Sequence, residues 1–381
     1  MLRALSSLYG GRGVSLVRGE GAYVWDGNGR RYIDFFNGHG AALFGHGAPA
    51  LVDALCRAAH GIWSSGAGCE SPAREEAARL LAEEIGGGRV FFCNSGTEAI
   101  EAALKLAAAL KGGRREIIAC RRAFHGRSCG SLALTFNPKY RAPFAALIPA
   151  VKHYAPEEIP AKISEETLAV FVEPVQGEGG VYPIPPEVGR AISEACRANG
   201  AFLVADEVQS GLGRCGAFFA SQGAGLSPDV VCVAKGLAGG MAVGAAIWRE
   251  ELGDFPPHSH GSTYGGNELA MNVALAALKY IKEKDLCAHA AKMGELIRSE
   301  ISKRDIPGVA AVRGRGLLIG AETKGASQEI VRVLQWRGLL SSAAGPRVVR
   351  FLPSFAVTEE TALAAVDIFE KTMKEMGGGV R

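Results

Sequence analysis

Short apolar runs alternate with helical stretches through the middle of this chain. The runs RVFFC, REIIAC, LAVFVEP, AFLVAD, VVCVAKG and VGAAIW have the length and the β-branched content of buried strands. Helical stretches such as EAIEAALKLAAALK and PPEVGRAISEACRANG lie between them. Because buried strands joined by helices form sheets that are covered on both faces, the pattern predicts an α/β fold with a mostly parallel central sheet.

The chain divides into three predicted segments. A glycine-rich segment, residues 1–50, contains GAYVWDGNGRRYIDF, in which the DGNG turn predicts a hairpin, and we expect it to form an arm and part of a smaller domain. The large α/β domain is expected over residues 51–266. After Gly266, a long helix in NELAMNVALAALKYIKEK, the strand-like GLLIGAE and VVRFLP, and a final helix from about Thr358 predict a smaller α+β domain over residues 267–381.

Composition and charge argue against several classes of protein. The chain of 381 residues is 48% hydrophobic and 21% charged, with a net charge of +3 and no block of lysine and arginine, so no nucleic-acid partner is expected. We expect no secretory signal and no membrane span, because no apolar stretch is long enough. The nine cysteines lack the spacing of a disulfide framework or a zinc site, and His39, His125 and His258 lack metal-like spacing and are read as ordinary polar or turn residues. A cytoplasmic protein without a metal is predicted.

Lys235 and Asp206 are the first candidates for chemistry. Each follows a buried run, as do Asn94 to Glu98 and Glu173, and ligands of such sheets bind beyond the carboxyl ends of the strands. A lysine confined between VVCVA and GLAGG has a lowered pKa, which suits a Schiff base and proton transfer. A carboxylate at the end of AFLVAD could pair with a protonated pyridine nitrogen. The alternatives are a solvated lysine and, for Asp206-Glu207, an acidic pair that caps a helix.

An anion site is predicted where NSGTEA joins a strand to a helix. Ser95 and Glu98 have the spacing of a capping box, and free N–H groups at a helix N-terminus suit a phosphate. An ordinary capped helix explains this motif equally well when it is taken alone. No Rossmann GxGxxG, Walker P-loop or GxSxG motif occurs in a suitable context, which argues against nicotinamide, ATP and serine-hydrolase chemistry.

Two arginines are candidates for binding substrate carboxylates. Arg127 follows Phe124 in FHGR, where the phenyl ring can stack on a cofactor and the planar guanidinium can take a carboxylate. A core aromatic beside a surface arginine is the alternative. Arg350 lies inside the apolar run VVRFLP and needs an anionic partner, for which Glu178 in EPVQGEGG is the candidate.

Seven motifs occur in order along essentially the whole chain: NSGTEA, FHGR, EPVQGEGG, DEVQSGLGRCG, PDVVCVAKGLAGG, HGSTYGGN and VRGRGLLIG. In these motifs the chain resembles the class III pyridoxal phosphate (PLP) aminotransferases of fold type I, in the acetylornithine and ornithine aminotransferase branch. The stretch FHGRSCGSLALTFNPKYRAPFAALIPAV is most similar to the archaeal and Thermus-type enzymes. Those transaminate aminoadipate or glutamate semialdehyde attached to the small acidic carrier protein LysW, with glutamate as donor, in lysine and arginine biosynthesis. Acetylornithine aminotransferase is the alternative, and glutamate-1-semialdehyde aminomutase and a non-catalytic protein of the same fold are further ones.

The resemblance also implies a role for each residue of the matched motifs. Cofactor binding is implied for Ser95, Gly96, Thr97, Phe124, Asp206, Glu207, Val208, Gln209, Lys235 and Thr263. Substrate binding is implied for Arg127, Glu178, Ser262 and Arg350. Asp206 and Lys235 are the implied catalytic residues, and Arg350, released from Glu178, would take the α-carboxylate of glutamate or 2-oxoglutarate. Ser262 and Thr263 would come from the neighbouring subunit, so the resemblance implies a homodimer with shared active sites.

The chain departs from the family pattern in three loops: Asn267-Glu268, Pro353-Ser354 and Gly239-Gly240-Met241. These changes alter loop rigidity near the site and bear on substrate preference. An acidic carrier would require a basic rim around the entrance, for which Arg121, Arg122 and Lys139 are hypothetical contributors.

Overall fold

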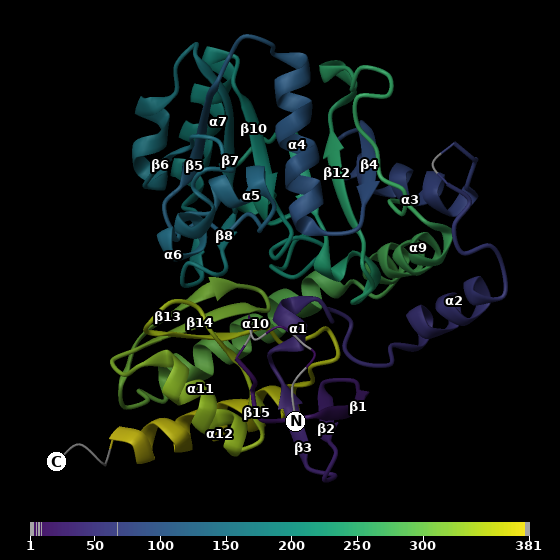
Figure 1. The fold of residues 1–381 in the computed structure, drawn as a ribbon. Helices are drawn as coiled ribbons and strands as arrows, with labels where there is room; N and C mark the ends of the chain where they lie inside the picture. The colour runs from purple at the N-terminus through teal and green to yellow at the C-terminus, as the bar shows by residue number, and fades with distance from the viewer. Residues whose placement is uncertain (1–3, 5, 7, 9, 67, 378–381) are drawn as a thin grey trace.

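A seven-stranded sheet organises the larger part of the computed structural model, which describes residues 4, 6, 8, 10–66 and 68–377 (Figure 1). In spatial order its strands are β4 (Arg89–Cys93), β12 (Gly244–Trp248), β11 (Val230–Val233), β10 (Phe202–Asp206), β7 (Thr167–Val172), β5 (Glu116–Cys120) and β6 (Lys152–Tyr154). Strand β12 runs antiparallel to β4 and to β11, and the other neighbouring pairs are parallel. The predicted α/β fold with a mostly parallel central sheet is confirmed.

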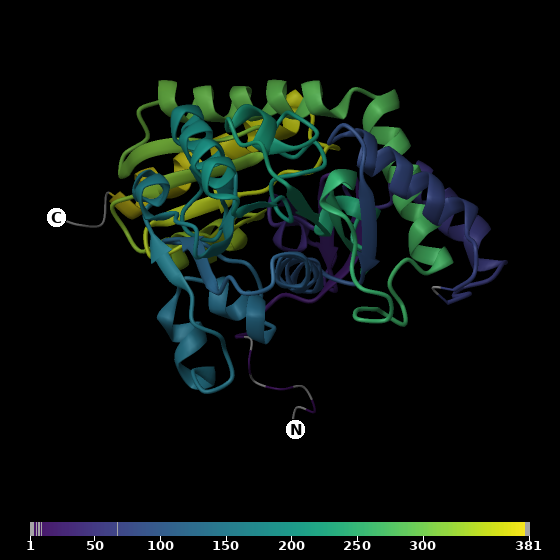
Figure 2. The same ribbon diagram turned by 90° about the horizontal axis from the view of Figure 1, so that it is seen from above.

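Both faces of this sheet are covered by helices, which explains why its strands are apolar throughout. In β5, Ile117 and Ala119 pack in the cluster that contains α4 (Gly96–Leu110), whereas Ile118 and Cys120 pack in the cluster that contains α7 (Pro186–Asn199). Successive side chains of a strand point to opposite faces, so each face needs its own apolar set. Seen from above, α4 is viewed end-on near the centre of the molecule (Figure 2).

Local sequence signals set the ends of these helices. Ser95 caps α4 by accepting a hydrogen bond from the N–H of Glu98 at 3.3 Å. Helix α7 begins with a proline and ends at Gly200, whose φ of 65° turns the chain directly into β10. The expected helix after Gly266 is α9 (Glu268–Glu283), and Asn267 caps it by accepting the N–H of Ala270 at 2.9 Å.

A smaller antiparallel sheet lies in the lower part of Figure 1. Its strands, in order, are β13 (Val309–Arg315), β14 (Leu318–Thr323), β17 (Val348–Phe351) and β16 (Ser342–Ala343). Helices α10 (Leu286–Lys303), α11 (Ser327–Trp336) and α12 (Glu359–Gly377) accompany this sheet. The expected strands GLLIGAE and VVRFLP are β14 and β17, and the final helix begins one residue after the expected Thr358.

The N-terminal arm pairs with a distant part of the chain. Strands β1 (Leu16–Glu20), β2 (Tyr23–Asp26) and β3 (Arg31–Asp34) are antiparallel, and the DGNG turn joins β2 to β3, so the predicted hairpin is confirmed. Strand β3 then pairs in parallel with β15 (Leu339–Leu340). The arm and the C-terminal part therefore share a sheet, while the domain bounds at residues 50 and 266 stay a prediction.

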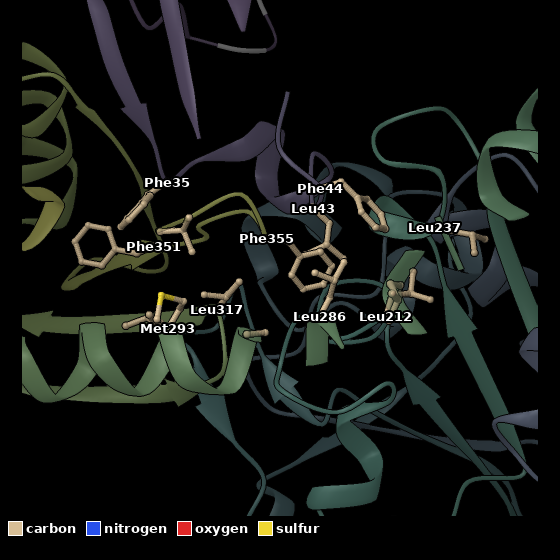
Figure 3. Packing of buried hydrophobic residues seen from close by; sticks show 14 of the residues in the cluster. Phe35, Leu43, Phe44, Leu212, Leu237, Leu286, Met293, Leu317, Phe351 and Phe355 are labelled. Carbon is tan, nitrogen blue, oxygen red and sulfur yellow. The ribbon is translucent and has the colours of Figure 1, made fainter. Parts of the chain in front are cut away.

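One apolar cluster connects the arm, the central sheet and the C-terminal part (Figure 3). Phe35 meets Phe351 edge-to-face at 6.2 Å between ring centroids, and Phe44 meets Phe355 in the same way at 5.4 Å. The helices α2 (Pro49–Ala59) and α3 (Pro72–Glu83) pack on α9 beside this cluster. Edge-to-face aromatic pairs add specific geometry to apolar burial, so this cluster fixes how the two sheets lie around the cavity described below.

The remaining elements are short. They are α1 (Asn37–Gly40), α5 (Cys129–Leu134), α6 (Pro138–Arg141), α8 (Ala220–Gly223), β8 (Val175–Gln176), β9 (Tyr182–Pro183) and the 3-10 turns Ala142–Phe144, Pro156–Lys162, Lys235–Ala238 and Glu250–Leu252. Among the described residues, no helix has both the length and the apolar character needed to cross a membrane.

Candidate active site

A cavity of about 360 Å³ lies beyond the carboxyl ends of β4, β5, β7, β10 and β11. The predicted site residues that line it are Ser95, Gly96, Thr97, Phe124, Arg127, Glu178, Asp206, Val208, Gln209 and Lys235. These come from segments far apart in the sequence, and the sheet brings them to one edge. Such an edge is the expected ligand site of an open α/β sheet.

Lys235 stands at the turn that follows β11. Its φ is +42°, in the left-handed region that a residue with a side chain rarely adopts, so the local backbone is strained. The side chain is half-buried in the cavity wall, and desolvation lowers the pKa of the amine, while Glu178 and Asp206 act in the opposite direction. A lysine with a lowered pKa has a larger neutral fraction, which both nucleophilic attack and proton transfer require.

Asp206 is held by two groups at the end of β10. Its Oδ1 accepts the N–H of Val208 at 3.0 Å, and its Oδ2 lies 2.7 Å from Nδ1 of His125. His125 is fully buried, so the expectation that it is an ordinary polar or turn residue is wrong. The sequence carried no signal for this contact, because the two residues meet only through the alignment of β5 with β10. The carboxylate of Asp206 therefore bonds His125 through Oδ2 and also lines the cavity.

Glu173 is a second buried carboxyl group of the cavity wall. Its Oε2 accepts the N–H of Phe124 at 3.0 Å, which fixes the backbone that carries the Phe124 ring. Burial raises the pKa of Glu173 well above its ordinary value, and Asp206 raises it further. In the sequence Glu173 stands out only by its position after a strand, whereas in the structure its carboxylate holds the backbone of the Phe124 loop.

The N-terminus of α4 forms one end of the cavity. The first N–H groups of a helix have no partner within the helix, and Ser95 Oγ accepts only that of Glu98, so those of Gly96 and Thr97 stay available to an anion. Glu98 completes the capping box in an altered form, because its carboxylate accepts the N–H of Asn94 at 2.6 Å. The hydroxyl of Thr97 accepts the N–H of Arg127 at 3.2 Å and thereby ties the helix to the neighbouring loop.

Arg350 and Glu178 form the ion pair expected from the sequence. Arg350 is fully buried in β17, and its Nη1 lies 2.5 Å from Oε1 of Glu178 and 3.1 Å from Oε1 of Gln209. Its Nε donates to Ser342 at 3.1 Å, whereas its buried Nη2 has no partner among the described residues. The charge of Arg350 helps to lower the pKa of Glu178 against the opposing effect of burial. One donor of a buried guanidinium is thus left for another anion.

Arg127 differs from Arg350 in exposure and in partners. It is exposed, and within the described part of the chain its guanidinium makes no ion pair or hydrogen bond. Its Cζ lies 3.7 Å from the ring centroid of Tyr140 and 5.5 Å from that of Phe124. All of its N–H donors therefore remain free to bind a carboxylate.

Four residues with implied roles do not line this cavity; one of them, Arg350, reaches it only through its partners Glu178 and Gln209, which do line it. The buried carboxylate of Glu207 accepts hydrogen bonds from the hydroxyl of Ser210 at 2.6 Å and the N–H of Ser221 at 2.7 Å, so its side chain serves the turn after β10. Ser262 lies against its own chain, where its hydroxyl accepts from Nδ2 of Asn94 at 3.1 Å. Thr263 is exposed. Any contact of Ser262 and Thr263 with a site in a second subunit stays a prediction.

One of the departures from the family pattern has a structural use. Glu268, which follows the cap residue of α9, accepts the N–H of Ser65 at 2.7 Å and pairs with Arg74 at 3.0 Å. The pair therefore fixes the loop after α2 to the start of α9. Met241, from the altered glycine loop, lines the cavity.

The class-III aminotransferase family matches residues 10–373, and the chain belongs to this family. Enzymes of this class depend on PLP and have fold type I, so the protein is a PLP-dependent aminotransferase.

Its relatives carry two different substrate names. The chain is 37% identical over 375 residues to the [LysW]-aminoadipate semialdehyde/glutamate semialdehyde transaminase of Sulfolobus acidocaldarius, covering 96% of each chain. It is 38% identical over 372 residues to the acetylornithine aminotransferase of Bacillus subtilis, again covering 96% of each. Among solved structures, the ornithine aminotransferase of Toxoplasma gondii superposes with a TM-score of 0.93 at 30% identity, over 98% of this chain and 92% of that one.

The residues of the cavity fit PLP. An anion site at the start of α4, a carboxylate at Asp206 and the amine of Lys235 match the phosphate, the ring nitrogen and the aldehyde of that cofactor. Glycine lets the loop after β5 pack closely against the start of α4, because a Cβ on Gly126 would lie 2.5 Å from the hydroxyl of Thr97, and the φ of Gly126 is +136°. The aromatic ring of Phe124 and the side chain of Val208 supply apolar surface for a planar ring.

Proposed function

We propose that the enzyme transfers an amino group between glutamate and the terminal semialdehyde of a LysW-bound aminoadipate or glutamate derivative, in lysine or arginine biosynthesis. Acetylornithine aminotransferase activity is the second candidate, because relatives with that name are equally similar over the same length. Both activities use the same donor, and they differ in what is attached to the α-nitrogen of the acceptor.

The Glu178–Arg350 pair is the observation that carries this proposal. Arg350 is buried with one free donor, whereas the side chain of Glu178 is 33% exposed. A donor such as glutamate can displace Glu178 and place its α-carboxylate on Arg350, which receives a new anion in place of the old one. The uncharged aldehyde end of the acceptor can enter while the Glu178–Arg350 ion pair stays intact, because Glu178 then neutralises the charge of Arg350.

In this proposal the side chains of the cavity have separate tasks. PLP, when bound, supplies the electron sink and carries the amino group between the two substrates. The carboxylate of Asp206 keeps a positive charge on the ring nitrogen, and His125 holds that carboxylate in place. The amine of Lys235 would hold the aldehyde carbon of the cofactor and, as a free amine after the donor has displaced it, would move the proton from the donor's Cα to the cofactor.

A second cavity gives the acceptor room beyond the first. It has a volume of about 650 Å³ and shares Phe124 and Glu178 with the first cavity, so the two spaces adjoin. Arg122 and Lys139 line it, which supports their proposed part in a basic rim. Arg121 pairs instead with Glu158 at 3.3 Å. An acceptor with a large acyl group or a carrier chain on its α-nitrogen fits this arrangement.

We also propose that the enzyme is a cytoplasmic homodimer with shared active sites. The loop that contains Ser262 and Thr263 is at the surface, and its Tyr264 side chain is 66% exposed. Trp63 is 62% exposed, and its loop is fixed to the start of α9 through Ser65. Exposed aromatic residues of this kind favour a partner surface, here a second copy of the chain.

A comparison of substrates tests the proposed function. The purified PLP-loaded enzyme is assayed with 2-oxoglutarate and each amino form in turn: LysW-linked lysine, LysW-linked ornithine, N-acetylornithine and free ornithine. The proposal expects the largest kcat/KM for a LysW-linked substrate, and a much larger value for N-acetylornithine would refute the carrier and support the second candidate.

Two rival functions make different predictions. Glutamate-1-semialdehyde aminomutase needs no separate keto acid. In such an enzyme, glutamate would not displace Glu178 from Arg350. A non-catalytic protein would show no change in cofactor absorbance when glutamate is added. A full spectral change with glutamate, reversed by 2-oxoglutarate, is the result expected for the transaminase.

A further inference from the structure

Arg127 has no charged or hydrogen-bonding partner for its guanidinium in the described part of the chain, although it lines the cavity wall. The position of Arg350 is set by hydrogen bonds to Glu178, Gln209 and Ser342. Arg127 is exposed, and a long side chain in that situation samples many rotamers and loses that freedom when it binds a ligand. Another side chain therefore has to hold the guanidinium of Arg127 in place if Arg127 is to bind a carboxylate efficiently.

Tyr140 is the residue in a position to do this. Its ring lies 3.7 Å below the guanidinium of Arg127 and meets the ring of Phe124 edge-to-face, with 6.3 Å between centroids and an angle of 90°. A stacked guanidinium keeps every in-plane N–H free, whereas a carboxylate clamp would use those donors and neutralise the charge. Stacking is thus the one kind of support that leaves Arg127 ready for an anion.

The short helix α6 holds Tyr140 in turn. Asn137 caps this helix by accepting the N–H of Lys139 at 3.0 Å, and Pro138 occupies its first position. Arg141 donates to the carbonyl of Phe136 at 3.1 Å. The backbone around Tyr140 is therefore anchored on both sides.

Tyr140 also stands at the border of the two cavities. It lines the larger one, Arg127 lines the smaller one, and Phe124 lines both. A substrate that reaches from Lys235 into the larger cavity has to pass this aromatic pair and the guanidinium above it.

We propose that Tyr140 is a positioning residue that holds the guanidinium of Arg127 for the carboxylate at the acylated end of the acceptor. The proposal rests on the carboxylate-binding role of Arg127 in the proposed function. It assigns to Tyr140 an effect on substrate affinity and none on the chemical step, because Tyr140 contacts Arg127 and does not line the cavity of Lys235.

The test uses N-acetylornithine as the probe, since its α-carboxylate and acylated nitrogen reproduce the end shared by both candidate acceptors. Tyr140→Leu in the PLP-loaded enzyme is expected to raise the KM for N-acetylornithine about fivefold, the upper factor expected for a cation–π contact at an exposed site. The kcat should stay within about twofold. Tyr140→Phe keeps the ring and should restore the wild-type KM.

A matched control and a double variant separate positioning from a general structural effect. Tyr154→Leu removes a half-buried tyrosine that lies under Lys162 and lines neither cavity, and it should leave both the KM for N-acetylornithine and kcat unchanged. In an Arg127→Leu background, Tyr140→Leu should have no further effect on the KM for N-acetylornithine.

Each contrary result has a distinct meaning. A Tyr140→Leu enzyme with an unchanged KM for N-acetylornithine, or with a lowered kcat instead of a raised KM, overturns the role of Tyr140 while the role of Arg127 stands. If Arg127→Leu leaves that KM unchanged, the proposed role of Arg127 is wrong and that of Tyr140 with it.

Discussion

Replacing Glu178 with glutamine removes the charge that neutralises Arg350 but keeps a side chain of similar size. In the wild type, glutamate has to displace a carboxylate that lies 2.5 Å from Nη1 of Arg350. Glutamine can still accept a hydrogen bond from the charged guanidinium of Arg350, so the substitution removes only the attraction between the two charges, which contributes about 0–1 kcal/mol for a pair open to solvent. Because the Glu178 side chain is 33% exposed, water weakens this attraction only in part, and we take about 1 kcal/mol. The Glu178→Gln enzyme should therefore bind glutamate about fivefold more tightly.

Single-turnover kinetics measure this affinity directly. The PLP-loaded enzyme is mixed with increasing glutamate, and the change in cofactor absorbance gives the dissociation constant, which is then compared with that of 2-oxoglutarate. Glu187→Gln, an exposed residue of α7, is the control that removes one negative charge elsewhere. A folded Glu178→Gln enzyme that binds glutamate as weakly as the wild type, or more weakly, would refute the idea that Glu178 competes with the donor for Arg350.

Three further substitutions test other parts of the site. Lys235→Arg should lower kcat by at least about a thousandfold, as expected when the group that moves the proton is lost, while equilibrium dialysis should still detect binding of 2-oxoglutarate. His125→Phe removes the 2.7 Å contact with Asp206, and loss of about 2 kcal/mol at a charged group should lower kcat about thirtyfold in steady-state assays. In the folded protein the pKa of Glu173 is raised above its ordinary value of 4.5. The buried carboxyl group therefore lowers the stability of the folded protein as the pH rises from 4.5 through the raised pKa. Glu173→Gln removes that loss, and melting curves should show its advantage over the wild type growing as the pH rises above 4.5; a constant difference would contradict the raised pKa.

Residues that follow apolar strands could be predicted from the sequence. Lys235 and Asp206 stand where buried runs end, and a parallel sheet brings such ends together whatever the details of its packing. The cap of α4 was equally predictable, because Ser95 acts on its own helix. The DGNG hairpin likewise depends on neighbouring residues only.

Contacts between distant segments could not be predicted in the same way. His125 bonds Asp206 only because β5 and β10 lie on either side of β7, and no local pattern encodes that register. The antiparallel direction of β12 leaves its apolar run unchanged, so VGAAIW reads like any other buried strand. The position of Tyr140 below Arg127 depends on how α6 packs, and a tyrosine in NPKYR carries no sign of its partner.

The parallel pairing of β3 with β15 has a consequence for how the chain is made. Ile33 leaves the ribosome early, but its partner Leu339 is synthesised near the end, so the N-terminal hairpin spends most of translation with an unsatisfied strand edge. Contacts of such long sequence separation slow folding and expose intermediates to aggregation. A nascent chain arrested before β15 should therefore leave the outer edge of β3 unpaired, and the sheet of the arm becomes complete only in the last part of synthesis.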